Sequence, residues 1–380
     1  LYRGVELPLT KVLAAMEDVG VRIDAYRMGE ITARLADRIE ELEARAHELA
    51  GEEFVLGSTQ QVARILFEKL ELTAGRKGKT GYSTDARVLR AIRADHEIVP
   101  VIEEWREYSK LLNTYLGPLP SLIGEDGRLH THFNQAVAST GRLSTSSPNL
   151  QAIPIRTELG REIRSAFVAD EGHRLVSADY SQVELRILAH VSGEPKLRES
   201  FAAGEDIHAA TAAEVLGKER SELTKNERNV AKMVNFGIIY GISSFGLSEN
   251  LDIPREQAQD YIDTYLARFP HVQDFIQRTI EQAERDGFVT TLFGRRRPIP
   301  ELKARNRQTR SLGERLAVNS VMQGTAADII KAAMVAIQRR LREEGRASRL
   351  VLQVHDELLL EVPEVETTAV RDLVRAELCG

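Results

Sequence analysis

The chain has 380 residues, of which 42% are hydrophobic, and it carries a formal net charge of −6 at pH 7. This length is enough for two or three subdomains with ample core. The single cysteine, Cys379, excludes an internal disulfide and favours a reducing compartment. No apolar run approaches the roughly 18 residues of a membrane span, so we expect no membrane partner. The start is helix-like and lacks Met, which suggests a fragment of a longer chain.

Positive charge is concentrated in two segments. The first, residues 295–315, contains only two acids, Glu301 and Glu314, against eight cations: Arg295, Arg296, Arg297, Lys303, Arg305, Arg307, Arg310 and Arg315. The second is the RKGK sequence at residues 76–79. The net negative charge argues against nucleic acid as a partner. The clustering of positive charge in two segments nevertheless leaves a polyanionic partner plausible.

The first half of the chain is predicted to be mainly helical. Apolar residues at helical spacing predict a helix over residues 7–50, and Ser58 is a candidate N-cap for a helix over 59–70. A loop over 73–84 precedes helices near 85–94 and 98–116. Residues 128–137 could form a strand, and the polar stretch 139–154 is predicted to be irregular.

The second half of the chain contains predicted strands that end at acidic residues. A short strand over 173–178 ends at Asp179, and helices follow from Pro195 to about Gly287. A short strand near 288–293 and one long helix over 309–342 come next. Residues 348–354 and 357–362 alternate apolar and polar side chains, which predicts a hairpin with Asp356 at its tip.

One helical segment, residues 228–241 (RNVAKMVNFGIIYG), carries an unusual face. Two cations and two aromatic rings recur every four residues, as Arg228, Lys232, Phe236 and Tyr240. An Arg and a Lys four residues apart repel each other, which an anionic ligand such as a polyphosphate would offset. The rings offer a stacking surface for a base. A surface helix with solvated cations and core aromatics is the alternative.

The acids Asp179 and Asp356 are candidate metal ligands. If both strands belong to one sheet, the two carboxylates can face each other at its rim, where a divalent cation would relieve their repulsion. Oxygen ligands beside a phosphate-binding helix favour Mg²⁺, and two such ions roughly 3.5–4 Å apart suit phosphoryl transfer. Glu357 adds a third acid. Either Asp could instead be an ordinary turn residue, and His355–Asp356 could suggest a phosphohydrolase, although no other His/Asp cluster supports it.

Five short motifs support a family resemblance. They are TGRLS at 140–144 with PNLQ at 148–151, DYSQVELR at 179–186, the RxxxKxxxFGxxYG pattern at 228–241, QGTAAD at 323–328 and VHDE at 354–357. In this order and at this spacing they resemble family A DNA polymerases, the bacterial DNA polymerase I type. The second, third and fifth look like motifs A, B and C of that family.

The resemblance implies an α+β fold, a right hand with an antiparallel palm sheet and a mainly helical thumb and fingers. Residues 1–24 would connect to the palm, 25–117 form the thumb, 118–189 the first part of the palm, 190–290 the fingers and 291–380 a C-terminally truncated second part of the palm. The implied function is template-directed transfer of dNMP from dNTP to a primer 3′-hydroxyl, in DNA replication and repair. Two Mg²⁺ ions would be the cofactors, with Mn²⁺ able to substitute.

The resemblance also assigns roles to single residues. The metals would be bound by Asp179, Asp356 and the Tyr180 carbonyl, with Glu357 secondary. The incoming nucleotide would contact Arg228, Lys232, His208, Phe236, Tyr240, Gln182 and Glu184, the last as a steric gate against a 2′-hydroxyl. Asp179, Asp356, Lys232 and Arg228 would be catalytic. DNA contacts would come from Arg142, Arg315, Asn319, Gln323, His355, Lys77, Lys79, Lys110, Asn134 and Gln135.

Residue type supports part of this assignment. Every Watson–Crick pair presents acceptors in the minor groove, so donors placed there test the shape of a pair without reading its sequence. Arg142 and Gln323 would be such donors, and Arg315, Asn319 and Gln323 recur every four residues on one helix face. Ordinary helix surface is the alternative for Asn319 and Gln323.

Several further expectations follow from the family. The chain would be a monomer in the bacterial cytoplasm, associated with the nucleoid, with nuclease domains upstream on the full-length chain. Leu112, Ser147 and Ala152 depart from the usual pattern, which puts DNA contacts near them in doubt. The family continues beyond residue 380 into another palm strand, so strand 357–362 would have an unpaired edge. A single-subunit RNA polymerase and a DNA-binding module without catalysis are the alternatives in function.

Overall fold

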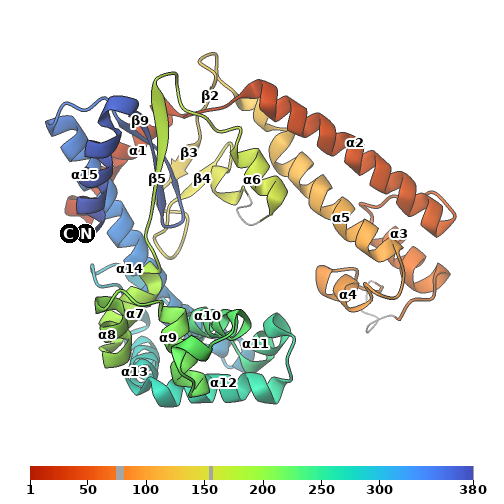
Figure 1. Ribbon diagram of the computed structural model, residues 1–380. Helices are drawn as coiled ribbons and strands as arrows, with labels where there is room; N and C mark the ends of the chain where they lie inside the picture. The colour runs from red at the N-terminus through yellow and green to blue at the C-terminus, as the bar shows by residue number, and fades with distance from the viewer. Residues whose placement is uncertain (74–80, 154–156, 380) are drawn as a thin grey trace. The chain divides into compact units, whose positions relative to one another are not determined.

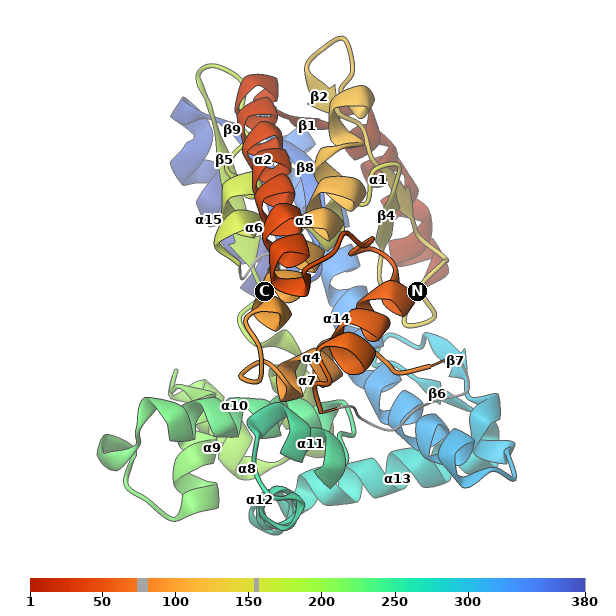
Figure 2. The ribbon, with the colours of Figure 1, turned by 90° about the vertical axis from the view of Figure 1, so that its right-hand side faces the viewer.

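The computed structural model describes residues 1–73, 81–153 and 157–379, and it divides into two compact units. Unit 1 contains residues 1–18, 133–145 and 172–380, and unit 2 contains residues 19–132 and 146–171. Figures 1 and 2 show the chain from two directions. Each unit has its own hydrophobic core.

Unit 2 is built around two long helices that lie side by side, α2 (Ala25–Ala50) and α5 (Ile98–Leu111) (Figure 1). Its other elements are β1 (Val21–Arg22), α3 (Thr59–Ala63), a π-helical segment (Arg64–Lys69), α4 (Ala86–Ala91), β2 (Arg128–Leu129) and α6 (Glu158–Arg164). Ser58 caps α3, as the sequence predicted, because its side chain accepts a hydrogen bond from the Gln61 amide.

The single helix predicted over residues 7–50 is wrong. The structure has α1 (Leu7–Val19) and α2, separated by β1. Gly20 ends α1 with a φ of +63°, and a Cβ there would lie 2.7 Å from the Leu129 carbonyl oxygen. Only glycine tolerates both conditions, so the break depends on a close approach between segments far apart in sequence. The strand predicted over 128–137 is likewise divided, into β2 and β3 (His132–Asn134).

Unit 1 contains a three-stranded antiparallel sheet with the order β5–β9–β8. The strands are β5 (His173–Asp179), β8 (Arg349–Val354) and β9 (Glu357–Pro363). Short pairs are formed by β3 with β4 (Ser144–Ser146) and by β6 (Phe288–Thr290) with β7 (Arg296–Pro298). The strand after Asp356, β9, pairs on both sides, so the expected unpaired edge of this strand is wrong.

The helices of unit 1 form two cores that share α14 (Arg307–Glu343). In Figure 2 this long helix extends from beside the sheet to β6 and β7. One core joins its first half to a helical group, and the other joins its second half to α1, β8, β9 and α15 (Thr367–Cys379). The helical group is α7 (Val183–Ser192), α8 (Pro195–Ala202), α9 (Ile207–Leu216), α10 (Lys225–Ile239), α11 (Ser244–Leu251), α12 (Arg255–Arg268) and α13 (Pro270–Asp286).

Helix α14 is also long and apolar enough to cross a membrane, the one such helix among the described residues. Its most apolar 18-residue window is 72% buried inside the protein. Burial of this extent is typical of a core helix, which passes the same test of length and composition.

A buried ionic cluster ties the start of the chain to α14. Lys331 has no exposed surface, and its Nζ lies 2.9 Å from a carboxylate oxygen of Glu6. Arg295 contacts Glu6 as well and donates to Asp328 at 2.6 Å, while the Thr291 hydroxyl donates to the other Asp328 oxygen at 2.7 Å. Arg295 therefore belongs to an internal network and is neutralised there, although the sequence places it in a basic segment.

We expect Glu6→Ala to lower the free energy of unfolding by about 3–5 kcal/mol, because it leaves the Lys331 ammonium buried without its nearest carboxylate. Chemical denaturation measures the change. The control is Asp372→Ala, which removes an exposed ion pair with Arg371 and should change the free energy by less than about 1 kcal/mol. Equal effects of the two substitutions would contradict the role given to the cluster.

Candidate functional site

The sheet brings two sequence-distant acids to one end. Asp179 is the last residue of β5 and pairs in register with Glu357, the first residue of β9. Asp356 lies in the turn between β8 and β9, and its carbonyl oxygen accepts a hydrogen bond from the Tyr180 amide at 3.2 Å. The Ser177 hydroxyl donates to Glu357 at 2.5 Å. Backbone pairing thus places Asp179, Asp356 and Glu357 near one another.

The electrostatics of this end fit a cation. Partial burial, followed by the charges of Glu357 and Asp356, raises the pKa of Asp179. Carboxylates that repel one another in this way are suitable oxygen ligands for a divalent ion. Among the residues that the structure describes, no group of three His, Cys, Asp or Glu is arranged to hold a metal. Fewer protein ligands suffice for Mg²⁺, which commonly completes its shell with water and substrate phosphates.

Glu184 lies between these acids and helix α10. Its side chain is only 4% exposed, and burial raises the pKa of its carboxyl group. Arg142 donates to one carboxylate oxygen at 2.6 Å, and the Tyr240 hydroxyl donates to the other at 2.6 Å. The same Arg142 nitrogen lies 3.9 Å from Asp356. A cation is therefore interleaved with the acids, which the sequence did not predict.

Helix α10 presents the face expected from its sequence. A capping box begins the helix, with the Thr224 side chain accepting from the Glu227 amide and Glu227 bonding back to Thr224. Val234 and Ile238 are buried. On another face the Phe236 and Tyr240 rings are nearly parallel, at 14°, with centroids 6.4 Å apart. This helix thus carries a stacking surface beside its cations.

Arg228 and Lys232 differ in their surroundings. Arg228 donates to Asp206 at 2.6 Å, whereas Lys232 is exposed. Asp206 also caps α9, accepting from the amides of His208 and Ala209. Burial opposes ionisation of Asp206, but Arg228 and the two amides outweigh it and lower its pKa. This ion pair fixes Arg228 beside the start of α9, and Asp206 is a functional candidate that the sequence analysis missed.

His208 is close to this group. Its ring is 5.7 Å from the Phe236 ring, and the residue is only 3% exposed. Burial is the main cause that lowers its pKa to about 4, with Arg228 and Lys232 adding to the effect and Asp206 opposing it. The imidazole is therefore neutral at pH 7, and it can act there as a hydrogen-bond donor but not as a cation.

The three hydrogen-bond donors predicted on α14 differ in their contacts and burial. Arg315 donates to Ser311 at 3.2 Å, and its side chain covers Gly241. Asn319 Nδ2 lies 3.5 Å from the Tyr240 carbonyl oxygen, and Gln323 is half-buried. Two buried polar atoms, Asn319 Oδ1 and Arg142 Nε, have no hydrogen-bond partner among the described residues. Water or a ligand would complete groups of this kind.

The remaining predicted residues are scattered. Gln182 and His355 both have positive φ, at +57° and +54°, the former just before α7 and the latter in the β8–β9 turn. Gln135 donates to the Glu6 carbonyl oxygen at 2.8 Å. Asn134 lies in β3.

The remaining residues predicted to contact DNA are three lysines of the predicted thumb. Lys110 is exposed on α5 in unit 2, and Lys77 and Lys79 fall outside the described residues.

Comparison with known proteins places these features in a family. The family model described as DNA polymerase family A matches residues 25–379. The thermostable DNA polymerase I of Thermus aquaticus is 49% identical over 383 residues, covering 100% of this chain and 46% of that protein. DNA polymerase I of Geobacillus stearothermophilus is 47% identical over 368 residues, covering 96% of this chain and 42% of that protein.

A solved structure gives the same result. It is described as the POL domain of Pol1 from M. smegmatis in complex with DNA primer-template and dNTP, and it superposes with a TM-score of 0.94 at 41% identity. The match covers 98% of this chain and 66% of that one. The fold is therefore that of a right-hand polymerase domain with an antiparallel palm sheet. The chain belongs to DNA polymerase family A, and it spans about half the length of the curated relatives it matches.

The buried His208 gives a testable dependence of stability on pH. The unfolded chain binds a proton at this residue near pH 6.5, but the folded chain does so only near pH 4. Lowering the pH through this window therefore favours unfolding, by up to about 1.4 kcal/mol per pH unit for one proton. We expect His208→Gln to flatten the fall in unfolding free energy between pH 6.5 and about 4. Denaturation curves at several pH values measure it, and identical slopes would contradict the assignment.

Proposed function

We propose that this chain catalyses template-directed DNA synthesis, in which a primer 3′-hydroxyl attacks the α-phosphate of a dNTP and pyrophosphate leaves. The observation that carries the proposal is one neighbourhood in unit 1, where the acids of the β5–β9 pair lie near Glu184 and Glu184 bonds to the end of α10. Family membership supports the proposal, and so does the likeness to a polymerase domain that was solved with DNA primer-template and dNTP bound.

Two Mg²⁺ ions, or Mn²⁺ in their place, would be held by Asp179, Asp356 and the Tyr180 carbonyl, with Glu357 secondary. Bound there, they would supply charge stabilisation to the reacting phosphate and lower the pKa of the primer hydroxyl. The fit rests on the register that places Asp179 beside Glu357 and near Asp356, where partial burial and then the charges of these two acids raise the pKa of Asp179. Asp179 and Asp356 would act in the chemical step, whereas neither would be needed to bind duplex DNA.

The α10 face would hold the nucleotide. Lys232 is exposed and Arg228 half-buried, and both would neutralise the triphosphate and the pyrophosphate that leaves. Phe236 and Tyr240 would provide the stacking surface, and Gln182 would lie beside the nucleotide. Glu184, fixed by Tyr240 and Arg142, would fill the space of a ribose 2′-hydroxyl.

Other residues would bind the primer-template. Arg142, Arg315, Asn319 and Gln323 would meet the minor groove, and the unpartnered Arg142 Nε, which is a donor, supports this. Further DNA contacts would come from His355, Asn134, Gln135, Lys110, Lys77 and Lys79. Residues 25–117 would form the thumb, 190–290 the fingers, and 1–24, 118–189 and 291–380 the palm and its connection. The protein would work as a monomer in the bacterial cytoplasm at the nucleoid, in replication and repair, with nuclease domains upstream.

We expect Asp179→Ala and Asp356→Ala each to abolish primer extension while leaving primer-template affinity nearly unchanged. The reason is that the acids serve the chemical step, and duplex affinity comes mainly from contacts to phosphates. Extension in Mg²⁺ and fluorescence anisotropy of labelled duplex measure the two quantities, with Asp372→Ala as a matched surface control. Wild-type extension by either variant would remove the metal assignment.

Sugar selectivity separates this proposal from the RNA polymerase alternative. We expect the unchanged chain to prefer dNTPs and Glu184→Ala to raise the relative kcat/KM for rNTPs, since alanine leaves room for the 2′-hydroxyl. Glu184→Gln is the matched control, because it keeps the volume and should keep most of the selectivity. The measurement is single-nucleotide incorporation with each triphosphate. A preference of the unchanged chain for rNTPs would refute the DNA polymerase assignment.

A further inference from the structure

Behind His208 lies a buried polar pair that the proposed mechanism does not use. Asn235 of α10 and Thr211 of α9 both have no exposed surface. Asn235 Nδ2 lies 3.2 Å from His208 Nδ1 and 3.0 Å from Thr211 Oγ1. The Thr211 hydroxyl in turn donates to Asn235 Oδ1 at 3.2 Å. These three side chains form a closed hydrogen-bond network between two helices.

The network sets the position of the proton on the imidazole. A neutral imidazole has one nitrogen that donates and one that accepts. The Asn235 amide nitrogen faces Nδ1 in the structure, and with the amide in this orientation Nδ1 accepts and the ring proton lies on Nε2. In this orientation Asn235 uses both amide hydrogens and its oxygen within the protein. Neither Asn235 nor Thr211 is exposed to solvent that could compete for these bonds.

This arrangement requires that the His208 imidazole is uncharged. The charged groups facing the ring are Asp206 before α9 and Arg228 and Lys232 of α10. Burial and the two cations together lower the pKa of the imidazole, against the opposing effect of Asp206, and keep it unprotonated at neutral pH. In the neutral ring the choice of tautomer decides whether Nε2 offers a proton or a lone pair. A lone pair there would repel a phosphate oxygen.

We propose that Asn235, held by Thr211, is a positioning residue that keeps His208 as the Nε2–H tautomer, a neutral donor to a phosphate oxygen of the incoming nucleotide. This inference rests on the proposed function and extends it to His208, which the family resemblance places in contact with the incoming nucleotide. Arg228 and Lys232 supply charge, and His208 supplies a directional hydrogen bond. Such a bond selects the position of the phosphate with little added attraction for other anions.

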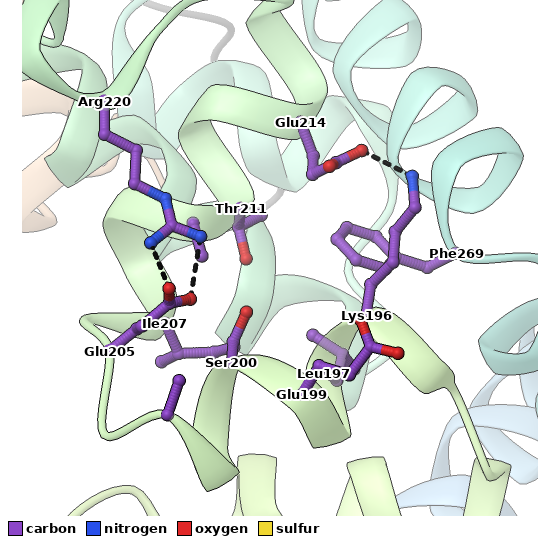
Figure 3. Close-up of a pocket in the computed structure, with 12 residues that line it drawn as sticks. Lys196, Leu197, Glu199, Ser200, Glu205, Ile207, Thr211, Glu214, Arg220 and Phe269 are labelled. Carbon is purple, nitrogen blue, oxygen red and sulfur yellow. Dashed lines mark hydrogen bonds and ion pairs between the residues drawn. The ribbon is translucent and has the colours of Figure 1, made fainter.

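Thr211 also lines a cavity whose cations, among the described residues, are already paired with acids. The cavity has a volume of about 250 Å³ and is shown in Figure 3. Both cations among the described residues that line this cavity are paired, Lys196 with Glu214 at 2.5 Å and Arg220 with Glu205 at 2.6 Å. These cations are therefore already neutralised, and the buried Thr211 hydroxyl bonds to Asn235.

The test compares Thr211→Val, which keeps the side-chain shape, with Asn235→Leu. The matched control is Thr279→Val, in which a buried hydroxyl bonded to the Phe275 carbonyl of its own helix is lost. Circular dichroism and thermal unfolding establish that each variant is folded. If Asn235→Leu fails to fold, Thr211→Val alone still tests the proposal.

The first measurement is direct. Nitrogen-15 spectra of chain labelled at histidine report which ring nitrogen carries the proton, and His208→Gln identifies the His208 signals. We expect the Nε2–H form in the unchanged chain and a mixture of tautomers in Thr211→Val and Asn235→Leu. An Nδ1–H or imidazolium form in the unchanged chain at pH 7 overturns the proposal. This measurement needs no activity, so it stands even where the proposed function fails.

The second measurement is kinetic. We expect Thr211→Val and Asn235→Leu to raise KM for dNTP by about 3- to 10-fold, the value of one hydrogen bond, with a smaller change in kcat. In a His208→Gln background the same substitutions should have no further effect, because they act through His208. Additive losses in the double variants, or an equal loss in Thr279→Val, would mean a structural role and overturn the proposal. Absence of any dNTP incorporation by the unchanged chain would instead refute the proposed function.

Discussion

The antiparallel pairing of β5 with β9 is the constraint on which the site depends. Asp179 pairs in register with Glu357, and the Tyr180 amide bonds to the Asp356 carbonyl. A slip of one residue would turn every side chain of β9 to the other face. Leu358 and Leu360 prevent it, since both are fully buried in the core beside α14 and α15. The hydrophobic core thus fixes the acids through the register of the strands that carry them.

Charged side chains link the acids to helix α10. Glu184 joins Arg142 to Tyr240 at the end of α10, and Asp206 joins Arg228 to the start of α9. Each long side chain is therefore held before any ligand arrives. Ordering such side chains in advance lowers the entropic cost of binding, and it explains why buried or partly buried acids accompany the cations in this neighbourhood.

Local patterns predicted the elements that local forces determine. The sequence predicted the helical period of α10, the hairpin around Asp356 and the cap at Ser58. The break at Gly20 and the central position of β9 were missed, because both depend on partners distant in the chain.

Side-chain partners across elements were also missed. Asp206 could have been found as an N-cap, but its pairing with Arg228 could not. The partners of the basic segment 295–315 were missed for a similar reason. Arg295 pairs with the buried Asp328, Arg297 bonds to Ser320 and Arg310 pairs with Glu284.

The shared helix α14 makes the two cores of unit 1 interdependent. Its first half is covered by the helical group, and its second half by the sheet, α1 and α15. If either core melts, it uncovers backbone and apolar surface of a helix that the other core still needs. The fraying of one half would have to stop inside a single helix of 37 residues, within its continuous run of hydrogen bonds. Unit 1 is therefore built as one cooperative unit, and its slowest-exchanging amides should lie in the middle of α14, where both cores meet.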